Sequence, residues 1–149
     1  MSKESAPQNP APLTSSRSKA RRRALDLLFE AEQRSVPVAD VVQRRRTSTD
    51  QVINAYSLTI IDGVVARQGA IDEFLQSYSQ GWPLERMPNV DRIILRIGAW
   101  ELLYNDDVPD GVAVSESVEL AKMLSTDDSP QFINGLLGRL QQLKPTLLA

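Results

Sequence analysis

Apolar residues recur at helical spacing along almost the whole chain from Arg17 onward. No stretch alternates apolar and polar residues between turn signals, as a half-buried strand would. The segment 89–105 is apolar nearly all round, which is typical of a helix at the centre of a bundle. The pattern predicts an all-α fold, a compact bundle of about seven helices.

Turn residues mark the joints between the expected helices. The stretch 80–88, rich in Gly and Pro, indicates a connector and predicts a subdomain boundary. Residues 1–16 hold three prolines and four serines, so we expect a disordered tail followed by one domain over residues 17–149. The expected helices run from about 18 to 34, 38 to 46, 49 to a stop or bend near Gly69, 71 to 78, 89 to 105, just after Gly111 to 124, and 129 to 143.

The chain has no Cys and no His among its 149 residues. Thiolate and imidazole nucleophiles, the usual general base and nearly every zinc site are therefore absent, and we expect neither an enzyme nor a cofactor or metal. A protein without disulfides is compatible with the cytoplasm, where we expect this one. No apolar run approaches the length that spans a bilayer, so no membrane contact is expected.

Positive charge is concentrated at one end of the chain. Five of the seven residues from Arg17 to Arg23 are basic. Residues 1–23 carry six Lys or Arg against one Glu, and residues 24–149 carry eleven against eighteen acidic residues, which gives +5 and −7. A basic end can neutralise phosphates, whereas an acidic body attracts a basic protein. The alternative is a solvated, solubilising chain end.

Single-stranded RNA fits this pattern better than duplex DNA, because no helix-turn-helix with a polar recognition helix is present. RNA-binding proteins add exposed aromatic rings to basic residues, since unpaired bases stack on them. Phe29 and Phe132 are the candidate rings, and we expect Phe29 on a surface stripe with Arg22. A second basic run, Arg44 to Arg46, either contacts RNA or only stabilises the C-terminal end of its helix.

Glu101 projects between apolar positions of the segment 89–105 and should lie in or beside the core. A buried carboxylate needs a partner, and helix N-terminal amides are one option.

Three blocks of the chain resemble the bacterial transcription antitermination factor NusB family. They are a basic start followed by Ala24-Leu-Asp-Leu-Leu-Phe29, the segment Val90-Asp-Arg-Ile-Ile-Leu-Arg-Ile-Gly-Ala-Trp-Glu-Leu-Leu103, and the C-terminal run from Ala113 to Leu137 that contains Phe132-Ile-Asn-Gly135. The resemblance covers about Arg17 to Leu143. It implies two packed three-helix subdomains and binding of a single-stranded boxA element in nascent ribosomal RNA, together with the ribosomal protein NusE. It further implies a larger complex with other Nus factors and RNA polymerase that resists termination.

The resemblance also implies roles for individual residues. Phe29 and Asp91 would face NusE. Phe29 stands where the family often has tyrosine, and Gln131 stands where a basic residue is common, so weaker RNA affinity of the protein alone is expected. The residues expected to bind RNA are Arg17, Lys19, Arg21, Arg22, Phe132 and Asn134.

The main alternative is a non-catalytic helical interaction module that self-associates, with the basic end only a solubilising tail. A homodimer is left open under either hypothesis. The RNA-binding domain at the front of certain RNA methyltransferases is a weaker alternative, because the 149 residues hold no catalytic domain.

Overall fold

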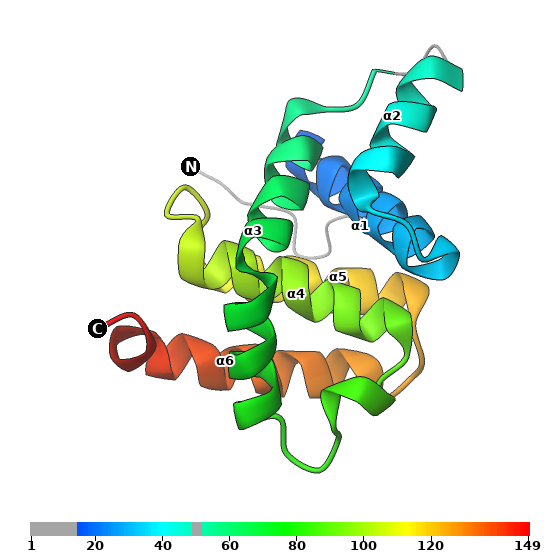
Figure 1. Cartoon of the computed structure of the whole chain (residues 1–149). Coiled ribbons are helices and arrows are strands. Elements are labelled where there is room, and N and C mark those ends of the chain that lie inside the picture. The colour runs from blue at the N-terminus through cyan, green and yellow to red at the C-terminus, as the bar shows by residue number, and fades with distance from the viewer. Residues whose placement is uncertain (1–14, 49–51) are drawn as a thin grey trace.

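The computed structural model describes residues 15–48 and 52–149 (Figure 1). Over these residues it contains six α-helices, one short 3-10 helix and no strand, which confirms the all-α fold. The elements are α1 (Ser16–Arg34), α2 (Val38–Ser48), α3 (Ala55–Tyr78), η2 (Leu84–Arg86), α4 (Asn89–Tyr104), α5 (Asp110–Leu124) and α6 (Ser129–Leu147). The expected tail falls largely on residues 1–14, which lie outside the described residues.

The helix count is six rather than seven because α3 continues through Gly69. Gly69 is exposed, and a Cβ at this position would meet no atom within 4 Å, so neither packing nor a turn ends the helix there. The expected start near Thr49 lies outside the described residues. In the structure Asn54 caps α3, and its side-chain oxygen accepts a hydrogen bond from the Tyr56 amide at 2.7 Å.

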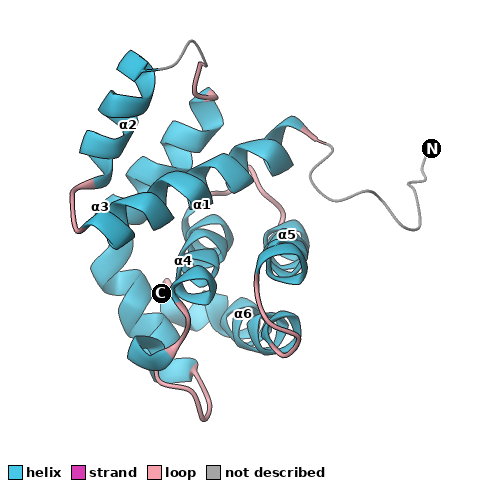
Figure 2. Ribbon diagram, turned by 90° about the vertical axis from the view of Figure 1, so that its right-hand side faces the viewer, coloured by secondary structure: helices cyan, strands magenta, loops and turns pink. Residues whose placement is uncertain are grey.

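Helix α4 lies at the centre of the bundle and contacts α1, α3, α5 and α6 (Figures 1 and 2). Eleven of its residues are buried, as its apolar circumference predicts. Two glycines allow close approach: a Cβ on Gly63 of α3 would collide with the Trp100 indole, and one on Gly98 would collide with Ser117 of α5. Substitution of either glycine would therefore force α4 away from its neighbours.

Helix α2 packs on α1, while α4, α5 and α6 contact one another pairwise. The buried side chains of both sets form one continuous apolar cluster. The connector between α3 and α4 contains only the single turn η2. Within the described residues no helix is long and apolar enough to cross a membrane.

Candidate nucleic-acid interface

The basic residues at the start of α1 divide into an outer and an inner set. Arg17 and Lys19 are exposed, and Arg22 is half-buried with a 3.3 Å ion pair to Asp26 on its own helix. We call these three side chains, Arg17, Lys19 and Arg22, the basic edge. Arg21 is only 3% exposed, because it lies on the face of α1 that packs into the bundle. The edge therefore carries fewer available charges than the sequence predicts.

Arg21 is held by two carboxylates from different helices. Its Nε lies 2.8 and 2.9 Å from the two carboxylate oxygens of Glu101 in α4, and one terminal nitrogen lies 3.0 Å from Glu116 in α5. Burial alone would lower the pKa of Arg21, but the hydrogen bond to Glu101 and the charges of both glutamates raise it. Arg21 was expected to contact RNA. In this structure its guanidinium is occupied inside the protein.

Glu101 is fully buried, as expected, but its partners are side chains rather than helix amides. Besides Arg21, the Tyr56 hydroxyl of α3 donates to it. The Asn105 amide in turn donates to the Tyr56 hydroxyl at 3.1 Å. Burial, reinforced by the Glu101 carboxylate, raises the pKa of the Tyr56 phenol, so the hydroxyl remains a donor at neutral pH.

The first turn of α1 is fixed by a second set of hydrogen bonds. Ser15 caps the helix and accepts from the Ser18 amide at 2.9 Å. The Ser18 hydroxyl donates to Glu116, the same carboxylate that binds Arg21. The Ser57 hydroxyl of α3 donates to the Ala20 carbonyl at 2.8 Å, so the basic edge stands on a helix start that is tied to α3, α4 and α5.

Asp91 was expected to face a protein partner, but it is fully buried. It lies in the first turn of α4, where its carboxylate accepts hydrogen bonds from the hydroxyls of Ser125 and Ser129, the latter at 2.7 Å. The start of α6 at Ser129 and the start of α4 thus meet at one negative charge, which both helix dipoles favour. A direct partner contact by this carboxylate does not fit the structure.

Phe29 does not stand free on the surface. It is half-buried and packs against the edge of the core, and Leu25, one turn earlier on the same stripe, is 3% exposed. The stripe that Phe29 shares with Arg22 is therefore a boundary of the core. A partner would contact only the part of the Phe29 ring that remains exposed.

Phe132 and Asn134 lie near the start of α6. The Phe132 ring meets the Trp82 ring edge to face, with centroids 4.9 Å apart and an interplanar angle of 69°. Asn134 and Gln131 are exposed. Asn134 also lines a shallow, mostly polar hollow on α6 with Gly135, Gly138, Arg139, Gln141 and Gln142. Trp82 thus holds one side of the Phe132 ring, while Asn134 is open to solvent.

Helix α5 joins the two halves of the predicted RNA surface. Glu116 near its start holds α1, and Ser125 at its end contacts the buried Asp91 beside α6. Nine residues separate these positions, which is about 14 Å along a helix. The two halves therefore lie near opposite ends of α5.

The other arginines are mostly engaged within the protein. Arg92 lies 2.7 Å from Glu32, and Arg96 binds Asp72 at 2.9 Å, so α4 is tied to α1 and α3. In the run Arg44 to Arg46, the middle residue pairs with Glu30 of α1, and the outer two are exposed. An RNA contact by this run stays a prediction.

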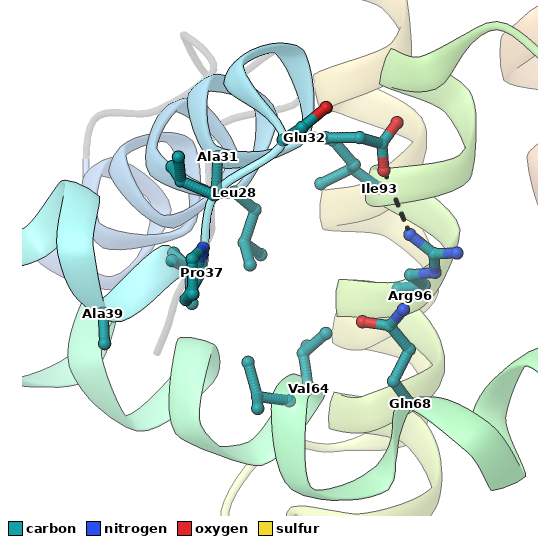
Figure 3. Close-up of a pocket in the computed structure, with 13 residues that line it drawn as sticks. Leu28, Ala31, Glu32, Pro37, Ala39, Val64, Gln68, Ile93 and Arg96 are labelled. Carbon is teal, nitrogen blue, oxygen red and sulfur yellow. Dashed lines mark hydrogen bonds and ion pairs between the residues drawn. The ribbon is translucent and has the colours of Figure 1, made fainter.

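A cavity of about 560 Å³ opens between α1, α2, α3 and α4 (Figure 3). Its wall is apolar apart from Glu32, Ser35, Gln68 and Arg96, and an ion pair of 3.4 Å joins Glu32 to Arg96 at its side. None of the predicted RNA-binding residues lines it. The basic edge is therefore a surface separate from this cavity.

Sequence reasoning missed Tyr56, Ser18 and Glu116 as parts of the site. The apolar spacing of α3 leaves Tyr56 off the core stripe, which indicates a role beyond packing, but nothing local connects it with Arg17. Their contact spans 39 positions of sequence and exists only in the folded bundle.

The sequence comparisons with known proteins identify the same family. Residues 18–142 match the family described as "NusB family". The "Transcription antitermination protein NusB" of Pseudarthrobacter chlorophenolicus is 76% identical over 135 residues, which is 91% of this chain and 99% of that protein. The protein of the same name from Kineococcus radiotolerans is 56% identical over 89% of this chain and 98% of its own length.

Solved structures agree in fold. T. maritima NusB superposes with a TM-score of 0.76 at 28% identity, covering 86% of this chain and 92% of that one. A chain from the crystal structure of antitermination factors NusB and NusE in complex with dsRNA gives a TM-score of 0.73 at 21% identity, over 85% of this chain and 96% of that one. An identity of 21% supports a similarity of fold only.

Proposed function

The chain belongs to the NusB family, and on this premise we propose that it is a transcription antitermination factor. It binds a boxA-type single-stranded RNA in nascent ribosomal RNA transcripts together with the ribosomal protein NusE. The RNA–protein unit then joins other Nus factors on RNA polymerase and helps the enzyme resist termination. In this role the chain works in the cytoplasm and performs no catalytic step itself.

The observation that carries the proposal is the basic edge on an otherwise acidic protein. Arg17 and Lys19 are exposed at a helix start that three other helices hold in place. A fixed set of cations loses little conformational freedom when it meets a phosphate backbone, and it releases counterions. The net charge of −7 over residues 24–149 repels RNA elsewhere. These opposite charges direct RNA to the basic edge.

In this proposal the predicted RNA residues have different tasks. Arg17, Lys19 and Arg22 contact phosphates. Phe132 and Asn134, near the other end of α5, contact bases. Arg21 supports the edge from inside through Glu101 and Glu116. Its predicted phosphate contact would require it to leave two carboxylates at once.

The NusE surface is proposed to include the exposed part of Phe29. Asp91 contributes by fixing where α4 meets α6, not by direct contact, because its oxygens are occupied by serine hydroxyls. The acidic body attracts a basic ribosomal protein at long range. Since Phe29 lacks a phenolic hydroxyl, its contact is apolar.

The test is a titration of fluorescent boxA RNA with the full-length protein, with and without NusE, over a series of salt concentrations. We expect affinity to rise with NusE, and log affinity to fall linearly with log salt. Arg17→Ala with Lys19→Ala should lower the salt slope by about 0.7 for each phosphate that the protein no longer neutralises. Arg67→Ala, on α3 and outside the basic edge, is the control with the same kind of charge change.

Affinity that ignores salt, or that does not improve with NusE, would contradict the proposal. A duplex of the same sequence as competitor decides whether single strands are preferred. Self-association without RNA binding, measured as complex mass, would favour the alternative interaction module. Point substitutions are preferable to deletion of residues 1–23, because deletion also removes Ser18 and Arg21 from the bundle.

A further inference from the structure

Arg17, the first basic residue of the edge, lies over an aromatic ring. Its guanidinium carbon is 4.6 Å from the centroid of the Tyr56 ring in α3. The Arg21 guanidinium approaches the same ring at 5.9 Å. Arg17 as a residue is exposed, while its guanidinium meets the ring.

Tyr56 is well placed to support the Arg17 guanidinium. Its hydroxyl donates to the buried Glu101 and accepts from Asn105, so both ends of the side chain are fixed. Its backbone lies in the first turn of α3, two residues after the capping residue Asn54. The ring is half-buried, and a rigid ring under a guanidinium holds that group in one orientation.

We propose that Arg17 and Tyr56 form a stacking platform for one base of the bound RNA, which extends the RNA site from α1 onto the start of α3. The inference rests on the proposed function, because it requires a single-stranded RNA on the basic edge. Unpaired bases stack on aromatic rings and on arginine planes alike. Arg17 supplies both a charge near the backbone and a flat surface that Tyr56 orients.

The chain contains a matched control pair. Arg67 of α3 lies over the Tyr104 ring at the same distance, 4.6 Å. Arg67 sits eleven residues further along α3 than Tyr56, about 16 Å away along the helix axis, and Tyr104 is the last residue of α4. An arginine–tyrosine contact as such is therefore present at both places, but only the first adjoins Lys19 and the rest of the basic edge.

The experiment uses full-length protein and a set of boxA RNA oligonucleotides, each with 2-aminopurine at one position. The fluorescence of this base is quenched when it stacks. At saturating protein we expect one position, towards one end of the RNA, to be quenched. Tyr56→Leu should abolish this quenching and weaken binding about tenfold. Tyr56→Phe keeps the ring and should keep the quenching.

Arg17→Lys gives an independent measurement, since this exposed residue can change without unfolding the protein. The charge remains, so the salt slope of binding should stay as in the wild type, while the quenching disappears with the planar group. Arg67→Lys and Tyr104→Leu should leave both readouts unchanged.

Quenching that survives both Tyr56→Leu and Arg17→Lys at saturation would overturn the platform. So would equal reductions from the Arg67 and Tyr104 substitutions, which would indicate a general effect on the fold. If the wild-type protein binds no boxA RNA, with or without NusE, the proposed function fails as well. The wild-type titration therefore separates the two failures.

Discussion

The two ends of α4 each bury a carboxylate, but they neutralise it in different ways. At the start, Asp91 accepts hydrogen bonds from the uncharged hydroxyls of Ser125 and Ser129. Near the end, ten residues later, Glu101 forms an ion pair with Arg21 and accepts from Tyr56. Both carboxylates are fully buried. The chemical group and the burial are alike, and only the partners differ.

The difference follows from what lies beside each group. Asp91 meets the N-termini of α4 and α6, whose dipoles already favour a negative charge, so hydroxyl donors suffice. Glu101 lies in the last turn of α4, where the helix dipole does not favour a negative charge, and a full positive charge is required. One end thus positions α6 with Phe132, and the other positions α1 with the basic edge. A single central helix supports both halves of the proposed RNA surface.

The largest expected effect comes from removing the charge partner. Arg21→Met leaves the Glu101 carboxylate buried with only a neutral donor, and it should lower the free energy of unfolding by about 3–5 kcal/mol. Denaturant unfolding at pH 7 measures this. Arg22→Met makes the same change at the next residue, where the ion pair is much more accessible to solvent than that of Arg21, and should cost less than about 0.5 kcal/mol. Equal effects of both variants would contradict the ionic role of Arg21.

At the other end of α4, Asp91→Asn keeps the shape but places an amide hydrogen against a serine hydroxyl. We expect a loss of about 2 kcal/mol in the free energy of unfolding. The loss should be smaller than that of Arg21→Met, because no charge is left without a partner. Asp127→Asn, an exposed control in the same region, should change stability by less than about 0.5 kcal/mol. A loss larger than that of Arg21→Met would reverse the comparison.

Tyr56→Phe removes the neutral donor to Glu101 while Arg21 remains. At pH 7 the expected loss is about 1.5 kcal/mol. The pKa of Tyr56 is raised in the folded protein, whereas the unfolded chain ionises near pH 10. Its contribution is therefore complete below pH 10 and declines above it, by up to about 1.4 kcal/mol per pH unit. The wild type should lose its advantage over Tyr56→Phe between pH 10 and 12. Parallel unfolding curves over this range would contradict the prediction.

The smallest effect is expected for Ser125→Ala. One carboxylate oxygen of Asp91 loses its donor, while Ser129 still donates to the other at 2.7 Å. A loss of about 1 kcal/mol, or roughly 2–4 °C in Tm for a chain of this size, should result. Ser115→Ala, at an exposed position of α5, is the control and should leave Tm unchanged. A Tm for Ser125→Ala equal to that of the wild type would mean that a single hydroxyl satisfies Asp91.

Much of the fold was predictable from local pattern. The starts of α2, α4 and α6 follow from Pro37, Pro88 and the Ser129–Pro130 pair, and the burial of α4 follows from its apolar circumference. By contrast, α5 begins at Asp110, before Gly111, and α6 continues through Pro145 to Leu147. Gly69 was misinterpreted as a break because a helix tolerates an exposed glycine at a cost of about 1 kcal/mol. That cost is small compared with the packing that α3 gains against α4.

The site was less predictable than the fold. The basic run and the family resemblance placed Arg21 among the RNA-binding residues, whereas the structure places it beside Glu101, 80 positions away. Asp91 was likewise expected, from the resemblance, to face a partner, whereas the structure buries it against Ser129 of α6. In both cases the burial of the charge depends on a partner from another helix, and no local pattern encodes that partner.

Residue type and helical spacing were enough to establish the all-helical class, the central place of α4, the burial of Glu101 and the separation of a basic end from an acidic body. These properties are local, so the amino-acid sequence carries them directly. Which arginines are supports and which remain available for RNA depends on the packed bundle, as does the position of Tyr56 under Arg17. Helical periodicity fixes the direction in which a side chain points, but only packing determines what it meets there.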